Sequence, residues 1–290
     1  MTSEDGYDCS DGLRGQIAVI TGASRGLGRV YAEKLAGLGA RVVLMARNRD
    51  TLDSVAAAIR ANGGEAVAIV ADVTDQISVT RAFADVDANL GSVDLLINSA
   101  GNLGVTGASW ELEAMAWWDT MALHLLGSFH CMQEAMRRMV GQGGGRIINL
   151  ASHAGAFRWP TVSAYSVAKA ALIKLTENVA VEARMQGIYV FAIHPGIVRG
   201  VGLAETMIDA RDTPNSALLD VAAWIQHETV MGHAVNADRG AQMVADLASG
   251  RYDFLNGRYI TVYDDLSALS LQADRIRKSD AMTMRIHPVT

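Results

Sequence analysis

The chain has 290 residues, half of them apolar, and a formal net charge of −6 at pH 7. This length and apolar content suffice for one large core, and an acidic balance without a long basic cluster argues against a nucleic-acid partner. Charged residues interrupt the apolar stretches before they reach the length of a bilayer crossing, so we expect no membrane association.

Residues 1–12 form a polar, acidic leader that lacks the basic start and apolar middle of a signal peptide. The two cysteines are Cys9, in this leader, and Cys131, in a stretch with helical spacing. We therefore expect a cytoplasmic protein with reduced thiols and no disulfide between the two.

Short apolar runs alternate with helical stretches along residues 13–265, which predicts a single α/β domain. Seven runs are expected as strands: 17–21, 41–46, 66–70, 93–97, 146–151, 188–193 and 258–262. The main expected helices are 29–38, 74–89 and 163–186. This alternation predicts a Rossmann-like, doubly wound sheet of seven parallel strands with helices on both faces. Ligands of such sheets bind at the carboxyl ends of the strands.

The first predicted strand runs into a glycine turn, Gly22-Ala-Ser-Arg-Gly-Leu-Gly28, and then into the helix 29–38. Glycines let the backbone approach a pyrophosphate, and a helix N-terminus offers free N–H groups and a positive dipole end. The spacing differs from the usual GxGxxG, and an ordinary glycine-rich turn is the alternative. Dinucleotide contacts are expected from Gly22, Ser24, Arg25, Gly26, Leu27 and Gly28.

Tyr165 and Lys169 stand four residues apart in the predicted helix 163–186, so the phenol and the ammonium project from one face. A cation beside a phenol lowers the pKa of the phenol towards working pH, which makes it a usable proton donor and acceptor for a carbonyl. Taken alone, such a pair is more often solvated helix surface.

In combination, these features resemble the short-chain dehydrogenase/reductase family over roughly residues 13–265. The motifs that carry the resemblance are TGxxxGxG at 21–28, Asp72-Val73, Asn98-Ser99-Ala100-Gly101, Ser152, YxxxK at 165–169 and Pro195-Gly196. Ser99 replaces an asparagine of the family pattern. The resemblance implies that Ser152 hydrogen-bonds the substrate carbonyl, that Tyr165 is the general acid and base, and that Lys169 holds the nicotinamide ribose.

The resemblance also implies further cofactor contacts. Residues at three strand ends would meet the adenine, its ribose and the nicotinamide, in that order: Asp72 and Val73; Asn98, Ala100 and Gly101; Pro195, Gly196 and Val198. For Asp72, a helix cap before 74–89 is an alternative or additional role.

The second predicted strand ends in Ala46, Arg47 and Asn48, where an acidic residue would bind a ribose 2′-hydroxyl. Arg47, and Arg25 in the glycine turn, could pair with the oxygens of a 2′-phosphate instead. We therefore expect NADP(H) rather than NAD(H). Two solvated surface arginines are the alternative.

His124 stands where the resemblance places an asparagine, three residues before Gly127. In the family, that asparagine is thought to hold a water that passes protons between the lysine and solvent. Histidine exchanges protons near neutral pH, so His124 could serve this relay. The alternative is a satisfied helix histidine in a slower enzyme.

The substrate is expected to be an apolar or aromatic small molecule with a carbonyl or a secondary alcohol, because His153, Phe157 and Trp159 flank the serine. Residues 200–236 are least like the family and are expected to form a lid over the substrate, without a metal site. Three tryptophans are expected to line the same mouth or to pack in the core: Trp110, Trp117 and Trp118.

Residues 266–290 continue beyond the family pattern, and 266–278 has helical spacing. We expect this extension to pack on its own subunit or on a neighbour. Family members usually form dimers or tetramers through the helices that carry residues like His124 and Tyr165. A homodimer or homotetramer is therefore expected.

Three functional classes remain open. The first is an NADP(H)-dependent carbonyl reductase or alcohol dehydrogenase, and the second is a lyase or isomerase on the same fold. The third is a catalytically weakened, cofactor-binding regulator, for which His124 and the glycine at position 200, often threonine in the family, are the arguments. The intact glycine turn and lysine favour the first class.

Overall fold

A computed structural model describes residues 13–202 and 215–286 of the chain. Seven parallel strands form one sheet in the order β3-β2-β1-β4-β5-β6-β7. The strands are β1 Ile17–Thr21, β2 Arg41–Ala46, β3 Glu65–Val70, β4 Leu95–Asn98, β5 Gly145–Leu150, β6 Ile188–His194 and β7 Tyr259–Thr261. The predicted Rossmann-like sheet is confirmed, and each strand end lies within two residues of its predicted position.

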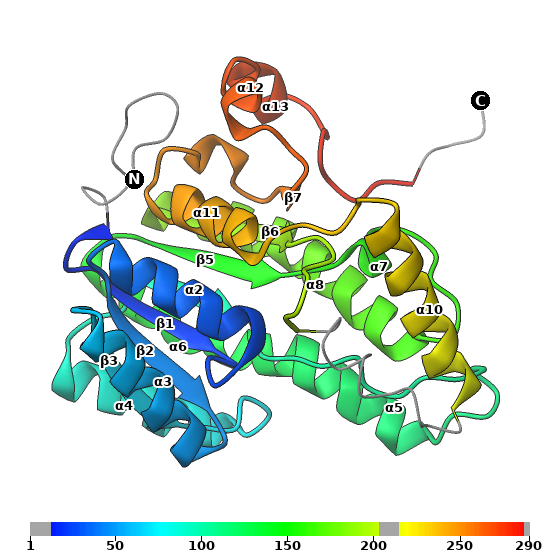
Figure 1. Cartoon of the computed structure of the whole chain (residues 1–290). Helices are drawn as coiled ribbons and strands as arrows, with labels where there is room; N and C mark the ends of the chain where they lie inside the picture. Colours follow the sequence, from blue (N-terminus) through cyan, green and yellow to red (C-terminus); the bar gives the residue numbers. More distant parts are fainter. Residues whose placement is uncertain (1–12, 203–214, 287–290) are drawn as a thin grey trace.

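Helices cover both faces of the sheet (Figure 1). One face carries α2 Gly26–Gly37, α3 Arg49–Ala61 and α11 Ala237–Ala248, and the other carries α4 Gln76–Asn89, α6 Gly127–Gln142 and α8 Ser163–Glu182. Side chains of a strand alternate between the two cores: in β1, Ala18 and Ile20 enter the first, whereas Ile17 and Val19 enter the second. Burial on both faces explains why the strands appear in the sequence as nearly continuous apolar runs.

The helix that carries Tyr165 is shorter than predicted. α8 ends at Glu182, and a separate 3₁₀ turn, Arg184–Gln186, precedes Gly187. Gly187 has φ 69°, and a Cβ there would lie 2.7 Å from the carbonyl oxygen of Gly143. This crowded left-handed residue ends the 3₁₀ turn and redirects the chain into β6. The prediction of one helix over 163–186 is therefore wrong in its last turn.

A π-helical turn, Ala122–Leu126, joins α5 (Ala114–Met121) to α6 without a break in the chain direction. π-Turns of this kind occur mostly as single insertions in α-helices, frequently at functional sites. Here the turn carries His124, whose side chain is buried. No spacing in the sequence pointed to this insertion.

The C-terminal extension packs on the chain's own sheet. It forms two short helices, α12 Leu266–Ser270 and α13 Ala273–Arg277, so the prediction of one helix over 266–278 is wrong. The N–H of Tyr259 in the edge strand β7 donates to the carbonyl of Met282 at 2.9 Å. Arg258 donates to three carbonyls of the extension: those of Ile276, Ser279 and Ala281. These bonds cover a sheet edge that would otherwise expose unpaired backbone groups.

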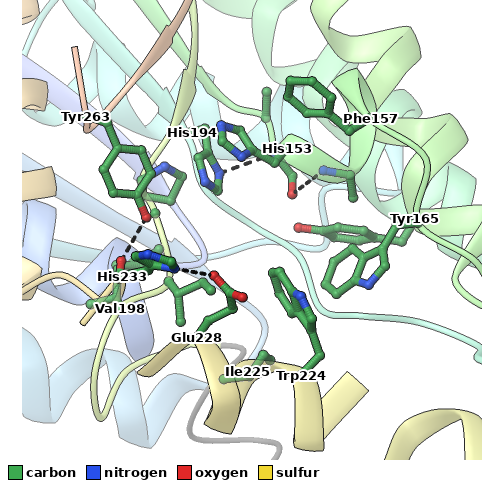
Figure 2. A pocket seen from close by; sticks show the side chains of 18 of the residues that line it. His153, Phe157, Tyr165, His194, Val198, Trp224, Ile225, Glu228, His233 and Tyr263 are labelled. Atoms are coloured by element: carbon green, nitrogen blue, oxygen red, sulfur yellow. Dashed lines mark hydrogen bonds and ion pairs between the residues drawn. The ribbon is translucent and has the colours of Figure 1, made fainter. Parts of the chain in front are cut away.

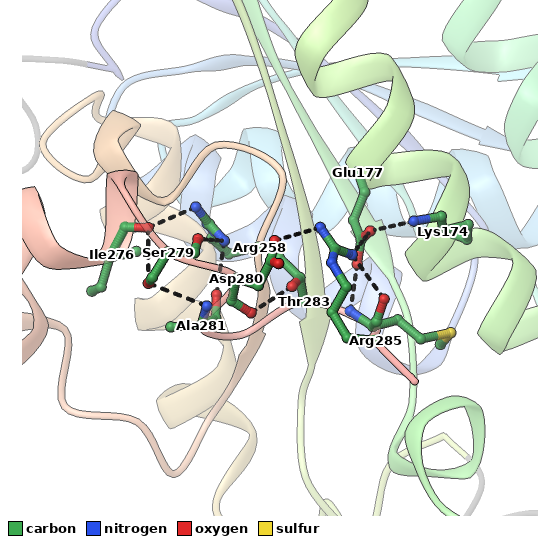
Figure 3. Close-up of polar contacts among 10 residues, drawn as sticks. Lys174, Glu177, Arg258, Ile276, Ser279, Asp280, Ala281, Thr283 and Arg285 are labelled. Atoms are coloured by element: carbon green, nitrogen blue, oxygen red, sulfur yellow. Dashed lines mark hydrogen bonds and ion pairs between the residues drawn. The ribbon is translucent and has the colours of Figure 1, made fainter. Parts of the chain in front are cut away.

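A second anchor ties the extension to α8 (Figure 3). The buried carboxylate of Glu177 accepts from Lys174 and Arg285, each at 2.8 Å, and from the N–H of Met284. Burial would raise the pKa of Glu177, but these hydrogen bonds hold it below its usual value. The extension is thus fastened to the sheet edge and to the helix that carries Tyr165.

Candidate active site

A cleft of about 690 Å³ opens at the carboxyl ends of the strands, where the topology predicts a ligand. It extends from the glycine turn, past β2 and β4, to the start of α8. Sixteen residues predicted for the site line it: Gly22, Ser24, Arg25, Gly26, Leu27, Gly28, Arg47, Asn48, Asp72, Val73, Ala100, Gly101, His124, Tyr165, Lys169 and Pro195. We call this cavity the long cleft.

The glycine turn forms a tight cradle at one end of the long cleft. A Cβ at Gly28 would lie 2.5 Å from the carbonyl oxygen of Gly22, and a Cβ at Gly22 would lie 2.8 Å from the Cα of Ala100. α2 begins at Gly26, and no side chain caps its N-terminus. Its first N–H groups and its positive dipole end can therefore bind an anion. Because the glycines carry no side chain, the backbone of the turn can approach a pyrophosphate closely.

Two buried polar side chains hold the strand ends beneath the cleft. The Oγ1 of Thr21 accepts from the N–H groups of Ser99 and Ala100 at 3.0 and 3.1 Å, which joins the ends of β1 and β4. Asn98 donates through Nδ2 to Oδ1 of Asn149 at 2.9 Å, and it is not among the lining residues. Asn98 therefore lies below the floor, whereas Thr21, a supporting residue, was not predicted for the site.

Two arginines line the long cleft near the end of β2. Arg25 and Arg47 are exposed, and neither forms an ion pair with another residue in the described ranges 13–202 and 215–286. Asn48 is engaged as the N-cap of α3, where its Oδ1 accepts from Thr51 N–H at 3.0 Å. The corner can thus present two positive charges to an anionic group.

Asp72 does not cap the next helix. Its Oδ1 accepts from the N–H and the hydroxyl of Thr74 at 2.9 and 2.7 Å, and α4 is capped by Asp75. Burial would raise the pKa of Asp72, but the bonds from Thr74 and the nearby charge of Arg47 lower it below its usual value. The predicted capping role of Asp72 is wrong, and its carboxylate stays ionised at the wall of the long cleft.

A second cavity, of about 540 Å³, lies beside the long cleft, and Tyr165 lines both (Figure 2). Other residues singled out in the sequence also line it, among them Leu27, Ser152, His153, Phe157, Trp159, Pro195, Gly196 and Val198. Several lining residues were not predicted, among them Ile225, Glu228 and Tyr263. Part of this lining comes from α10 (Ser216–Val230), inside the predicted lid 200–236, of which residues 203–214 lie outside the described part. We call this the front cavity.

The three predicted tryptophans line neither cavity. Trp110 and Trp118 are 87% and 56% exposed, and Trp117 donates through Nε1 to Oγ of Ser163 at 3.1 Å. The expectation that they line the mouth or pack in the core is wrong, because α5 and the segment before it turn these rings outward or onto the start of α8. Trp159 and Trp224 take that place, with ring centroids 5.1 Å apart.

Ser152, Tyr165 and Lys169 come together where the two cavities meet. The Oγ of Ser152 accepts from Ala154 N–H at 3.2 Å, which fixes the serine at the start of the short helix α7 (His153–Ala156). Nζ of Lys169 lies 5.6 Å from the centroid of the Tyr165 ring and donates to the carbonyl of Leu150. The predicted proximity of phenol and amine is found, and the hydroxyl of Ser152 is within hydrogen-bond reach of the phenol.

The pKa of the phenol differs from the prediction. Burial raises the pKa of Tyr165, and the hydrogen bond with Ser152 offsets only part of this increase. Burial also lowers the pKa of Lys169 to about 7, because the ammonium is desolvated. The two groups therefore sit in a dry environment in which the neutral phenol and the neutral amine are favoured. The simple expectation that the cation lowers the phenol pKa is wrong for this structure.

The buried Lys169 should make the stability of the cofactor-free protein depend on pH. The folded protein releases this proton near pH 7, whereas the unfolded chain keeps it up to about 10.5. Between these values the unfolded state binds more protons, so the free energy of unfolding rises with pH; below pH 7 the full penalty applies. Lys169→Met should thus stabilise the protein at pH 7 by roughly 4 kcal/mol, at 1.4 kcal/mol per pK unit, and far less at pH 10.

Thermal denaturation of both proteins at pH 7 and pH 10 measures this difference. Lys278→Met, which removes an exposed lysine, is the matched control and should shift the melting temperature little and equally at both pH values. An equal shift at both pH values for Lys169→Met would contradict the prediction.

His124 is buried next to these groups and stays neutral. Its Nε2 donates to the carbonyl of Asn102 at 2.7 Å, and its Nδ1 has no partner among the described residues. Burial, and then the charge of Lys169, lower the pKa of His124 to about 3. The ring lies edge-on to Tyr165, with centroids 5.2 Å apart. A relay through a protonated His124 is disfavoured near neutral pH, whereas the free Nδ1 can accept a hydrogen bond.

Two stacked histidines lie next to Ser152. The rings of His153 and His194 stack with centroids 3.9 Å apart, and the N–H of His153 donates to Nδ1 of His194 at 3.4 Å. Burial lowers the pKa of both, that of His194 to about 3. Both rings are therefore uncharged near neutral pH and contribute shape and hydrogen bonding, not positive charge, to the front cavity.

Cys131 is a buried thiol in α6, and burial raises its pKa to about 12. Cys9 lies outside the described residues. Within the described ranges, no cluster of histidine, cysteine, aspartate and glutamate is arranged to hold a metal ion. In the same part of the chain, no helix has both the length and the apolar character that a bilayer crossing requires.

Comparisons with known proteins agree with this geometry. Residues 16–211 match the family model described as "short chain dehydrogenase". The chain is 34% identical over 249 residues to cis-4-hydroxycyclohexanecarboxylate dehydrogenase of Sinomonas cyclohexanicum, covering 85% of this chain and 94% of the relative. It is 37% identical over 221 residues to 3-oxoacyl-[acyl-carrier-protein] reductase of a Synechocystis strain, covering 76% and 87%. A structure of a variant actinorhodin polyketide ketoreductase with NADPH superposes with a TM-score of 0.78 at 27% identity, over 90% of this chain and 97% of the other.

Proposed function

The chain belongs to the short-chain dehydrogenase/reductase family, and from this premise we propose that it is an NADP(H)-dependent oxidoreductase that interconverts a carbonyl and a secondary alcohol. The observation that carries the proposal is the position of Tyr165, which lines both the long cleft and the front cavity. A proton donor at this junction can reach a substrate oxygen in one cavity while a nicotinamide lies in the other.

The side chains act on the oxygen of the substrate. When bound, the nicotinamide supplies the hydride for reduction or accepts it during oxidation. Ser152 donates a hydrogen bond to the carbonyl oxygen, and Tyr165 donates its phenolic proton to the same oxygen as the hydride arrives. In the alcohol-to-ketone direction, Tyr165 takes that proton back. Lys169 binds the ribose hydroxyls next to the nicotinamide, and its protonated form, accessible near neutral pH because its pKa is about 7, stabilises the phenolate when that forms.

The free guanidiniums of Arg25 and Arg47 support NADP(H) over NAD(H). A 2′-phosphate at the end of β2 would meet these charges, and Ala46 provides no carboxylate to repel it. The ketoreductase structure with NADPH agrees with a cofactor of this class in a related fold. Asp72, Val73 and Ala100, on the other side of the cleft, would contact the adenosine.

The lining of the front cavity supports an apolar or aromatic substrate. Apolar side chains of its lining include Phe157, Trp159, Val198 and Trp224. The names of the relatives include an alicyclic acid and an acyl-carrier-protein substrate. We assign neither of them to this chain, because the lining of the front cavity, and not the family, determines the substrate.

We also propose a homodimer or homotetramer. Exposed apolar side chains gather on the two helices next to His124 and Tyr165: Leu126, Phe129 and Val140 on or before α6, and Val167 and Val181 on α8. Such surfaces are typical of subunit interfaces.

Absorbance at the nicotinamide band tests the proposed activity. The protein is incubated with NADPH and a panel of ketones and aldehydes, or with NADP⁺ and alcohols. Consumption of NADPH with stoichiometric alcohol formation is expected. Conversion of substrate without change in the nicotinamide band would favour the lyase or isomerase class, and tight NADPH binding without any conversion would favour the regulator.

A further inference from the structure

The front cavity has an apolar end and a polar end. Aromatic side chains line the part near Tyr165, among them Phe157, Trp159 and Trp224. Glu228, His233 and Tyr263 line the polar part, and Figure 2 shows them on the side opposite Phe157. A substrate that fills this cavity would therefore meet a different chemistry at each end.

Glu228 is held so that its carboxylate faces the cavity. It lies on α10 one helical turn after Trp224, so both side chains project from the same face. Its Oε2 accepts from Nδ1 of His233 at 2.7 Å, and its Oε1 lies 3.4 Å from Nδ1 of His227. These contacts hold the pKa of Glu228 below its usual value. Only 21% of the side chain is exposed, and Figure 2 shows the carboxylate directed into the cavity.

The position of His233 is itself fixed by the backbone. Its carbonyl accepts from the hydroxyl of Tyr263 at 3.0 Å, and Val235, two residues further on, forms a β-bridge with Val198, which lines the front cavity. These two contacts hold the backbone beside the imidazole that hydrogen-bonds to Glu228. The carboxylate is thus oriented by two histidines that are close to it in the chain, His227 and His233.

Glu228 carries the main negative charge in the described lining of the front cavity. Among the described lining residues, Glu228 is the only carboxylate, and His153 and His194 are neutral near pH 7. The described lining also contains the guanidinium of Arg158, an exposed residue, and the imidazole of His233, which hydrogen-bonds to Glu228. A carboxylate can only accept hydrogen bonds, so this end of the cavity needs a donor and repels an anion.

We propose that Glu228 forms a subsite for a hydroxyl group at the end of the substrate remote from the reacting carbonyl, and that it excludes substrates with a carboxylate at that end. This inference rests on the proposed oxidoreductase function and names the substrate class as an apolar hydroxy-ketone or the corresponding diol. A neutral hydroxyl fits this end of the cavity, because it donates a hydrogen bond that the carboxylate can accept.

The experiment compares ketones that differ only in the remote group. Two frames of different length are used, cyclohexanone and acetophenone, each substituted at position 4 with hydroxymethyl, ethyl or carboxylate. For the wild type, kcat/KM should be highest for hydroxymethyl and lowest for carboxylate, with about a tenfold gap between ethyl and carboxylate in at least one frame. Glu228→Gln should reduce the ethyl-to-carboxylate ratio about tenfold, and this ratio cancels any general loss of activity.

Asp220→Asn is the matched control, because it makes the same change at an exposed position on α10 outside the cavity lining. It should leave the ratios unchanged. Equal turnover of the three ketones, preference for the carboxylate, or an unchanged ratio in Glu228→Gln would overturn the inference while leaving the oxidoreductase proposal intact.

Measurements of ketone binding distinguish a failure of the Glu228 subsite proposal from a failure of the proposed oxidoreductase function. Dissociation constants of the same ketones for the NADPH complex are measured from the change in reduced-nicotinamide fluorescence. Discrimination in binding that depends on Glu228, without turnover of any ketone, would support the subsite and count against the oxidoreductase function. Absence of both turnover and discrimination would overturn both.

Discussion

Replacing Tyr165 by phenylalanine is expected to lower kcat about 10²–10⁴-fold while NADPH still binds. Among the residues that the structure describes, Tyr165 alone lines both cavities with a side-chain proton donor, and the change removes this donor but leaves the ring and its packing against His124 in place. Because Ser152 and Lys169 remain, the substrate oxygen keeps a hydrogen bond but loses its proton source. kcat and kcat/KM should therefore fall together.

The measurement combines steady-state kinetics with titration of NADPH fluorescence. Tyr189→Phe makes the same chemical change in β6, away from both cavities, and should have wild-type kinetics. Retention of more than a tenth of the turnover in Tyr165→Phe would remove the assignment of the general acid. Loss of NADPH binding would mean that the phenol holds the cofactor, which the proposed mechanism does not require.

The second large effect is expected for Arg47→Asp, which should decrease the preference for NADPH over NADH by about 10²-fold. A charge-assisted hydrogen bond contributes about 1.5–3 kcal/mol, and the new carboxylate adds repulsion of the 2′-phosphate. The same carboxylate can accept a bond from the ribose 2′-hydroxyl of NADH. The affinity for NADPH should therefore fall and that for NADH should rise or stay constant.

The ratio of kcat/KM for the two cofactors, with one ketone held at saturation, measures the preference. Arg184→Asp places the same charge change on an exposed turn before β6, at the edge of the sheet opposite the long cleft, and should not alter the ratio. A wild-type preference for NADH, or an unchanged ratio in Arg47→Asp, would show that Arg47 is a solvated surface charge.

The elements that could be predicted from the sequence are those whose structure depends on residues close together in the chain. The strands β1 and β2 match their predicted bounds because an unbroken apolar run is buried on both faces of a parallel sheet. The glycine turn followed by a helix, and the spacing of Tyr165 and Lys169, likewise depend on a few adjacent residues. The end of α8 and the π-turn at His124 were missed, because both result from packing against other segments.

The site residues likewise divide into those that the sequence identified and those that it missed. The sequence indicated which residues lie at the strand ends, but not that Asn98 points below the floor or that Trp110 and Trp118 face solvent. It did not identify Glu228, which reaches the front cavity from a helix far along the chain from Ser152. Nothing in the sequence around a helical glutamate indicates which cavity its side chain will line.

By itself, the sequence determined the order of strands and helices, the family, and the chemical groups at the carboxyl ends of the strands, because periodicity and short motifs encode these locally. Only the tertiary structure decided which of those groups share a cavity and which protonation state each prefers. Burial shifts the pKa values of Tyr165, Lys169 and His124 away from their usual ranges, and burial depends on contacts between segments that are distant in the chain.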